Sequence, residues 1–240
     1  MPEETVLQAS RGSRFNPATR KRVMLALLLN LVWGAILFGA AGRLDWARGW
    51  VYFGLCLLSV AVNSVVVFWK NPGLVAERWK RHTGTKPFDK VFMVLYTPAV
   101  FALPVVAGLD AGRFGWAPLP WPTLWCGIVL QLLAIPPVAW SMATNPHLEA
   151  TVRIQHDRGH QVIATGPYAL VRHPMYVGAL LSLAGGPLVL GSAWAYAPAG
   201  FAVLLFVFRT ALEDRTLRRE LPGYEEYAQR TRYRLVPGLW

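Results

Sequence analysis

The sequence predicts an all-α protein that crosses a membrane several times. Of its 240 residues, 54% are hydrophobic and only 15% are charged, whereas soluble domains carry about 25% charged residues. The apolar residues form runs close to the ~20 residues that a helix needs to cross the hydrocarbon core. The chain also has 11 Trp and 8 Tyr residues, which are common at membrane interfaces. We expect a polytopic helical bundle of four spans and a C-terminal helical hairpin, with five to six membrane helices in all.

The first four spans are expected where the apolar runs have span length: 23–41, 50–69, 91–109 and 121–143. The third run contains Pro98 and Pro104, and the fourth contains Pro136 and Pro137. Proline is tolerated inside a span where neighbouring helices satisfy the freed carbonyl groups. The paired prolines predict a kink in the fourth helix.

The last apolar stretch, 176–208, is too long for one span. It is broken at Gly185-Gly186-Pro187 and again at Gly191. We therefore expect two shorter helices that turn near residues 190–194. The sequence alone allows this hairpin either to cross the membrane fully or to re-enter it.

The basic residues predict the topology. All but three of the 24 Lys and Arg residues fall in four segments: 1–22, 70–90, 143–172 and 209–240. The other three, Arg43, Arg48 and Arg113, fall in the loops between them. Only an even number of crossings puts all four segments on the cytoplasmic side, where Lys and Arg are enriched. We expect a single membrane domain over 1–240 in a bacterial or archaeal cytoplasmic membrane, with both termini cytoplasmic and 1–22 as a cytoplasmic tail.

The formal net charge of +11 raises nucleic acid as a partner. The basic residues, however, flank the apolar spans and form no separate basic domain. Membrane topology explains the charge, and we expect no nucleic-acid partner. The expected partners are the lipid bilayer and a lipophilic substrate, and the sequence does not determine the oligomeric state.

Two polar clusters bracket the hairpin. The first, at 159–178, has a Gly-Pro turn, then Arg172 and His173 directly before an apolar helix. Ionisable groups at such a boundary usually have a partner, although interfacial anchoring explains them equally well. The second has Arg209 and Glu213 on one helix face, for which an ordinary helix-end ion pair is the simplest explanation. Folding the hairpin back brings the two clusters together, as a functional site requires.

Taken in order, these residues resemble the isoprenylcysteine carboxyl methyltransferase family. The string Gly-Pro-Tyr-x3-Arg-His-Pro-x-Tyr-x-Gly at 166–178 is followed, after the hairpin, by Glu-Asp-x2-Leu at 213–217 and Gly-Tyr-x2-Tyr at 223–227. The resemblance is strong over about 145–240 and is only one of hydropathy over 23–110. It implies that 145–240 is the catalytic half, whose helices and cytoplasmic loops bind S-adenosylmethionine without a Rossmann sheet. Consistent with this, no Gly-x-Gly-x-x-Gly loop follows a predicted strand.

The resemblance gives a role to twelve residues. It implies that Glu213 holds the ribose or the amino group of the cofactor. It implies that Arg209, the one residue expected to be catalytic, faces the methyl acceptor. The other implied cofactor-binding residues are Gln155, His160, Gln161, Val162, Ile163, Tyr168, His173, Pro174, Met175 and Tyr176. No metal ion is expected.

The family acts on a prenylated C-terminal cysteine, but a short chain resembles the prokaryotic members, which act on other acceptors. We therefore expect methyl transfer to a lipophilic or small molecule with a thiol, carboxylate or hydroxyl group. One alternative is a membrane NADPH-dependent reductase of the sterol type, which would need more spans and a basic pocket for the 2′-phosphate. Another is a scaffold or transport component, for which repeated halves would be typical.

Overall fold

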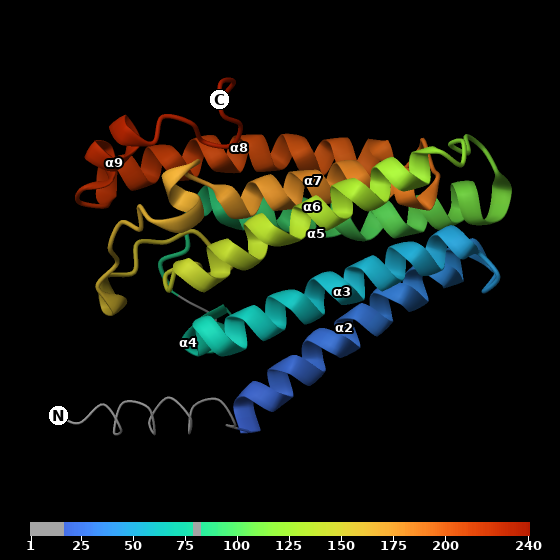
Figure 1. Ribbon diagram of the computed structural model, residues 1–240, viewed down its shortest axis with the longest axis horizontal. Helices are drawn as coiled ribbons and strands as arrows, with labels where there is room; N and C mark the ends of the chain where they lie inside the picture. Colours follow the sequence, from blue (N-terminus) through green and yellow to red (C-terminus); the bar gives the residue numbers. More distant parts are fainter. Residues whose placement is uncertain (1–16, 79–82) are drawn as a thin grey trace.

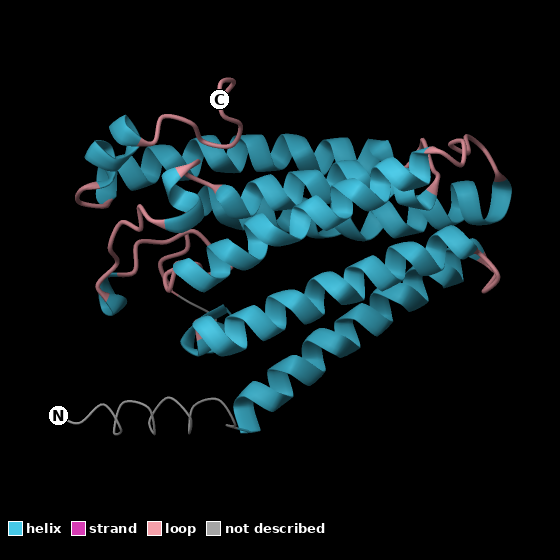
Figure 2. Ribbon diagram, viewed as in Figure 1, coloured by secondary structure: helices cyan, strands magenta, loops and turns pink. Residues whose placement is uncertain are grey.

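The computed structural model describes residues 17–78 and 83–240 and is built from helices (Figures 1 and 2). In chain order they are α2 (Pro17–Ala41), α3 (Ala47–Lys70), α4 (Pro72–Arg78), α5 (Pro87–Ala107), the π-helix η1 (Gly108–Phe114), α6 (Thr123–Thr144), the short 3-10 helices η2 (His156–Arg158) and η3 (Gly166–Ala169), α7 (Pro174–Leu190), α8 (Tyr196–Glu220) and α9 (Tyr224–Arg230). Of the predicted cytoplasmic tail, 1–16 lie outside the described residues and 17–22 begin α2.

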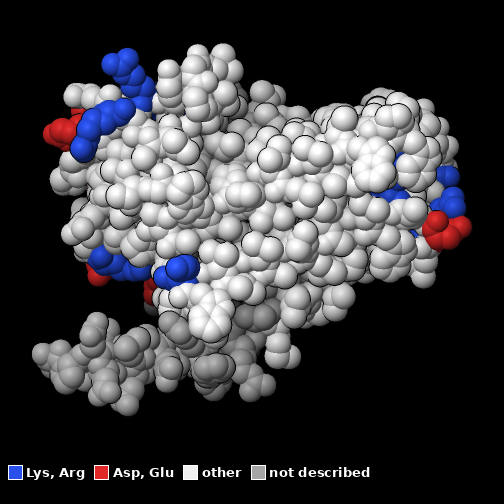
Figure 3. All heavy atoms as spheres, viewed as in Figure 1, with Lys and Arg blue, Asp and Glu red and all other residues white. Residues whose placement is uncertain are grey.

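Five helices are long and apolar enough to cross a membrane: Met24–Ala41, Ala47–Lys70, Pro87–Phe114, Thr123–Thr144 and Tyr196–Glu220. The sixth, α7, is apolar but shorter. This confirms the predicted polytopic bundle and places this protein in the membrane. The charged side chains visible in Figure 3 gather at the two ends of the molecule and leave an uncharged band between them, as a bilayer requires.

The hairpin of α7 and α8 extends along the whole bundle (Figure 1). Its turn packs on the loop that joins η1 to α6: the Leu119 amide donates to the Gly191 carbonyl at 2.8 Å, and the Ala193 amide donates to the Ala117 carbonyl at 3.0 Å. These contacts lie at the end of the bundle opposite the long loops at 145–173. The hairpin therefore turns level with the α5–α6 connection and does not turn back half-way.

Glycines allow α6 and α7 to pack closely. A Cβ atom at Gly178 would lie 2.6 Å from the carbonyl oxygen of Ala134, and one at Gly127 would lie 2.6 Å from the backbone nitrogen of Val189. Small residues let membrane helices approach in this way. The close packing brings the start of α7 beside the end of α6, where the loop 145–163 begins. Helix α8 continues past the apolar run to Glu220, so its last turns also project into this region.

Candidate functional site

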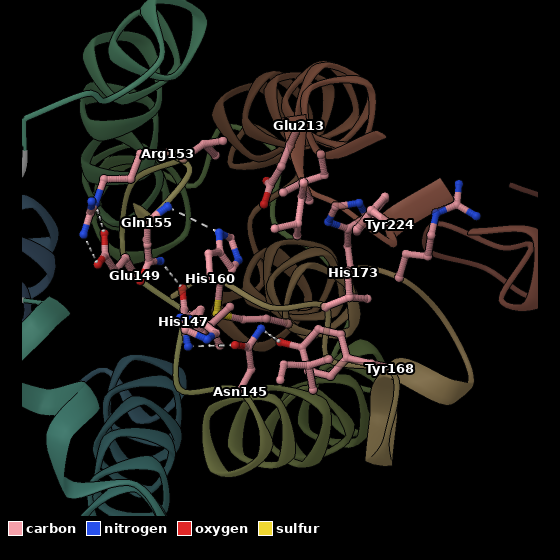
Figure 4. A pocket seen from close by; sticks show the side chains of 18 of the residues that line it. Asn145, His147, Glu149, Arg153, Gln155, His160, Tyr168, His173, Glu213 and Tyr224 are labelled. Carbon is pink, nitrogen blue, oxygen red and sulfur yellow. Dashed lines mark hydrogen bonds and ion pairs between the residues drawn. The ribbon is translucent and has the colours of Figure 1, made fainter. Parts of the chain in front are cut away.

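A pocket lies at the end of the bundle where the loop 145–163, the start of α7, the end of α8 and α9 meet (Figure 4). It contains about 790 Å³ of space not filled by atoms, part of it open to solvent. All twelve residues selected from the sequence line it. The other lining residues are Asn145, His147, Leu148, Glu149, Thr151, Val152, Arg153, Arg172, Leu217, Leu221, Tyr224 and Tyr227.

The Gly-Pro-Tyr string forms the turn that delivers Tyr168 to the pocket. Gly166 has φ +59°, and a Cβ atom there would lie 3.0 Å from the side chains of Trp140 and Thr144. A side chain at this position would be strained by the backbone conformation and would crowd Trp140 and Thr144. The Tyr168 hydroxyl accepts a hydrogen bond from the Asn145 side chain at 3.2 Å, which ties this turn to the end of α6.

Arg172 and Asp214 form a buried ion pair at the pocket, which we call the clamp. Asp214 is fully buried, and its two oxygens accept from Arg172 at 2.7 and 3.1 Å. Arg218, Arg234 and the Tyr224 hydroxyl donate to the same carboxylate at 3.2, 3.0 and 3.1 Å. Arg172 also donates to two backbone carbonyls of the C-terminal segment. This clamp joins α7, α8, α9 and the C-terminus. Sequence spacing did not predict this clamp, although both residues directly neighbour predicted site residues.

Arg209 and Glu213 share a face of α8 but have different partners. Glu213 accepts a 2.5 Å hydrogen bond from the Tyr176 hydroxyl. The Nε atom of Arg209 is 2.9 Å from Oδ1 of Asp89 on α5, and its guanidinium lies 4.3 Å from the Phe92 ring centroid. The simple ion pair between Arg209 and Glu213 that their spacing suggested is therefore wrong. A long-range ion pair frees Glu213 to face the pocket (Figure 4).

The loop side of the pocket is built around two neighbouring histidines. The centroids of the His147 and His160 rings are 4.8 Å apart, and the rings are tilted by 39°. The Gln155 side chain donates to the His147 carbonyl at 2.6 Å and accepts from Arg158 at 2.8 Å. Gln155 lines the pocket, but both ends of its amide are engaged in holding this loop. Arg153 forms ion pairs with Glu149 and Asp157 at the edge of the same loop. Figure 4 shows Arg153 next to Gln155.

The lowered pKa of His160 implies that the stability of the folded protein depends on pH. Burial and the neighbouring His147 lower the pKa of His160 from 6.5 to about 4, so the unfolded chain takes up this proton before the folded chain does. The stability contributed by the neutral ring is complete above pH 6.5 and is lost as the pH falls toward 4. We expect His160→Gln to lose less thermal stability than the wild type over this interval in detergent. His156→Gln, at an exposed position, should keep the wild-type loss. Equal losses in all three proteins would contradict the assignment.

The described residues, 17–78 and 83–240, contain no group of three or more His, Cys, Asp or Glu side chains that could hold a metal ion.

Part of this chain matches a protein-family model and two curated relatives. Residues 127–219 match the isoprenylcysteine carboxyl methyltransferase (ICMT) family. The cobalt-zinc-cadmium resistance protein CzcN of Cupriavidus metallidurans is 34% identical over 114 residues. The nickel-cobalt-cadmium resistance protein NccN of Alcaligenes xylosoxydans xylosoxydans is 30% identical over 112 residues. Each alignment covers 46% of this chain and 51% or 52% of the relative, so the chain spans about half the length of the curated relatives it matches.

The matched segment contains most of α6, all of α7 and almost all of α8, together with every one of the twelve residues selected from the sequence. The family is one of membrane methyltransferases, and five apolar helices fit such a protein. Over residues 127–219, this chain is similar to the isoprenylcysteine carboxyl methyltransferase family.

Proposed function

We propose that this protein transfers a methyl group from S-adenosylmethionine to a lipophilic or small acceptor that carries a thiol, carboxylate or hydroxyl group. One observation carries the proposal: three separate parts of the family segment, 155–163, 168–176 and 209–213, line a single pocket at one end of a membrane bundle. Side chains far apart in sequence converge there on one pocket, as a binding site requires.

The pocket wall suits the adenosine part of this cofactor. Tyr168, Tyr224 and Tyr227 form an apolar cluster with Leu221, against which Val162 packs. Such a cluster offers flat apolar surface to an adenine ring. Burial raises the pKa of Tyr168 to about 12, so this hydroxyl stays neutral and can still donate or accept a hydrogen bond.

Polar groups in the wall suit the ribose and the amino-acid part. The Glu213 carboxylate can accept from a hydroxyl or an ammonium group, and its hydrogen bond from Tyr176 fixes its orientation. His147 Nδ1 is buried and has no hydrogen-bond partner among the described residues, whereas His173 Nε2 lies 3.6 Å from Oδ1 of Asp214. Because buried polar atoms are rarely left unpaired, a bound molecule would satisfy His147.

S-adenosylmethionine supplies a methyl group that its sulfonium makes electrophilic. The chain's own residues then need mainly to hold the two reactants in line and to exclude water. An acceptor that arrives as a thiolate or carboxylate needs no base. Arg209 stays protonated and lines the pocket, so it would hold the acceptor anion. His173, which stacks on Tyr176 with ring centroids 5.5 Å apart, would stay on the cofactor side.

The cofactor assignment is tested by ligand binding. We expect S-adenosylhomocysteine, and not NADPH, to raise the thermal stability of the detergent-purified protein. Glu213→Gln should weaken S-adenosylhomocysteine about ten- to a hundredfold by calorimetry, because a charge-assisted hydrogen bond contributes roughly 1.5–3 kcal/mol. Glu220→Gln is the matched control, since Glu220 lies on the same helix but pairs with Lys86 outside the pocket. Unchanged affinity in Glu213→Gln would remove Glu213 from the site, and stabilisation by NADPH alone would favour a reductase.

We further propose that the pocket opens to the cytoplasm of a bacterial or archaeal cell. The segments 70–90, 143–172 and 209–240, which hold most of the described Lys and Arg residues, meet at the pocket end of the bundle. Arg43, Arg48 and Arg113 lie in or beside the loops at the other end. By the positive-inside rule the pocket end is then cytoplasmic, and so is the C-terminus.

A further inference from the structure

We infer that Asp89, in the first turn of α5, is the positioning residue for Arg209 and thereby fixes the acceptor side of the pocket. The inference rests on the proposed function. Asp89 lies outside the family segment 127–219 and outside every motif recognised in the sequence. It is fully buried and is not among the residues that line the pocket, so it acts only through its neighbours.

The Asp89 carboxylate joins α8 to the pocket loop. Its Oδ1 atom is 2.9 Å from Nε of Arg209, within ion-pair distance although the N–H does not point at the oxygen. Its Oδ2 atom accepts from the Val152 backbone amide at 2.7 Å. Arg209 in turn donates from Nη2 to the Ala150 carbonyl at 3.0 Å. A single buried carboxylate thus fixes both the guanidinium and the loop segment directly before the cofactor-lining residues.

Helix α5 also supplies an aromatic face for the same guanidinium. Phe92 is three residues after Asp89 and so lies on the same side of α5. The Arg209 guanidinium carbon is 4.3 Å from the Phe92 ring centroid and 5.3 Å from that of Tyr176, distances at which cation–π attraction is effective. Tyr176 also donates to Glu213. A continuous chain of contacts therefore runs from Asp89 through Arg209 to the cofactor side.

The arrangement leaves part of the guanidinium for a ligand. Arginine has five N–H donors. Arg209 donates one Nη2 proton to Ala150, and its Nε lies within ion-pair distance of Asp89. Among the described residues, none is hydrogen-bonded to Nη1, while Arg209 lines the pocket. Asp89 offsets the cost of burying the charge and keeps the fork in one orientation. The group that complements the remaining donors is an anionic oxygen or sulfur of the acceptor.

Two substitutions separate the ion pair from the loop contact. Asp89→Asn keeps an oxygen that can accept from Val152 but removes the charge beside Arg209, whereas Asp89→Ala removes both. The matched control is Asp110→Asn: Asp110 is also fully buried, but it accepts from Ser192 and the Ala117 amide at the opposite end of the bundle. Thermal midpoints in detergent report the general cost of losing a buried carboxylate.

The first measurement needs no substrate. Phenylglyoxal modification of the whole protein, read by mass spectrometry, reports how firmly each guanidinium is held. In the Asp89→Asn variant, phenylglyoxal should modify Arg209 several-fold faster than in the wild type. The modification rates of Arg43 and Arg113 should not change. Asp110→Asn should leave the rate at Arg209 unchanged. If Asp89→Asn also leaves it unchanged, Asp89 does not position Arg209.

The second measurement is methyl transfer from radiolabelled S-adenosylmethionine to N-acetyl-S-farnesylcysteine, a prenylated thioether carboxylate. Asp89→Asn should lower kcat/KM for this acceptor on the order of tenfold, as expected for one misplaced charge-assisted contact, with S-adenosylhomocysteine affinity changed less than about twofold. A loss of cofactor affinity as large as the loss of kcat/KM would show a general structural role and overturn the inference.

If Asp89→Asn fails to fold, Asp89→Glu makes the same comparison with the charge kept but displaced. A wild type that neither binds S-adenosylhomocysteine nor transfers methyl groups would refute the proposed function, and the phenylglyoxal rates would still decide the role of Asp89.

Discussion

Replacing Asp214 by asparagine is expected to lower the free energy of unfolding by about 3–5 kcal/mol, the usual cost of leaving one partner of a buried ion pair unpaired. Asp214 is fully buried and Arg172 is 4% exposed, so neither side chain can be rehydrated without opening the clamp. The same change frees Arg218 and Arg234, which also donate to this carboxylate. Denaturation in detergent measures the loss, and limited proteolysis should show earlier cleavage after α9.

The control for this prediction is an ion pair of similar geometry in solvent. The Nε atom of Arg43 is 2.7 Å from Oδ1 of Asp45, but the two side chains are 51% and 75% exposed. Asp45→Asn should leave the unfolding transition unchanged, since exposed pairs contribute little. If Asp214→Asn were equally neutral, the clamp would not stabilise this end of the bundle.

Replacing Arg209 by alanine is expected to reduce methyl transfer by on the order of a hundred- to a thousandfold, which corresponds to roughly 3–4 kcal/mol of transition-state stabilisation. The Arg209 side chain is 7% exposed and lies within ion-pair distance of Asp89 on α5. Affinity for S-adenosylhomocysteine should stay nearly constant. Arg209→Lys should restore only part of the activity, because an ammonium group cannot reproduce the planar fork.

Side-by-side assays of the two site residues decide whether their roles differ. Glu213→Gln should lose cofactor affinity, and Arg209→Ala should lose turnover at constant affinity. Arg215→Ala, at an exposed position on the same helix that does not line the pocket, serves as the control for removing a charge from α8. Losses of equal size in affinity and turnover for Arg209→Ala would refute its assignment to the acceptor.

The sequence determined by itself where the membrane helices lie. Hydropathy and helix length are local properties, so apolar runs such as 50–69 and 121–143 correspond to α3 (Ala47–Lys70) and α6 (Thr123–Thr144). The break at Gly191 correctly marked the hairpin turn, because Gly191 has φ +76°. The ordered motifs on both sides of that hairpin also selected residues that meet in one pocket, since a hairpin returns its two ends to the same side.

The pairing of the charged groups depends on the three-dimensional packing of the helices. The spacing of Arg209 and Glu213 suggested a pair, yet Arg209 lies against Asp89 of α5, and Glu213 accepts from Tyr176 of α7. The burial of Asp214 among several arginines was likewise not apparent from sequence spacing. An ion pair depends on the distance between two side chains in space, and helix packing sets that distance. Hydropathy places α5 and α8 in the membrane, but it does not specify which of their faces meet.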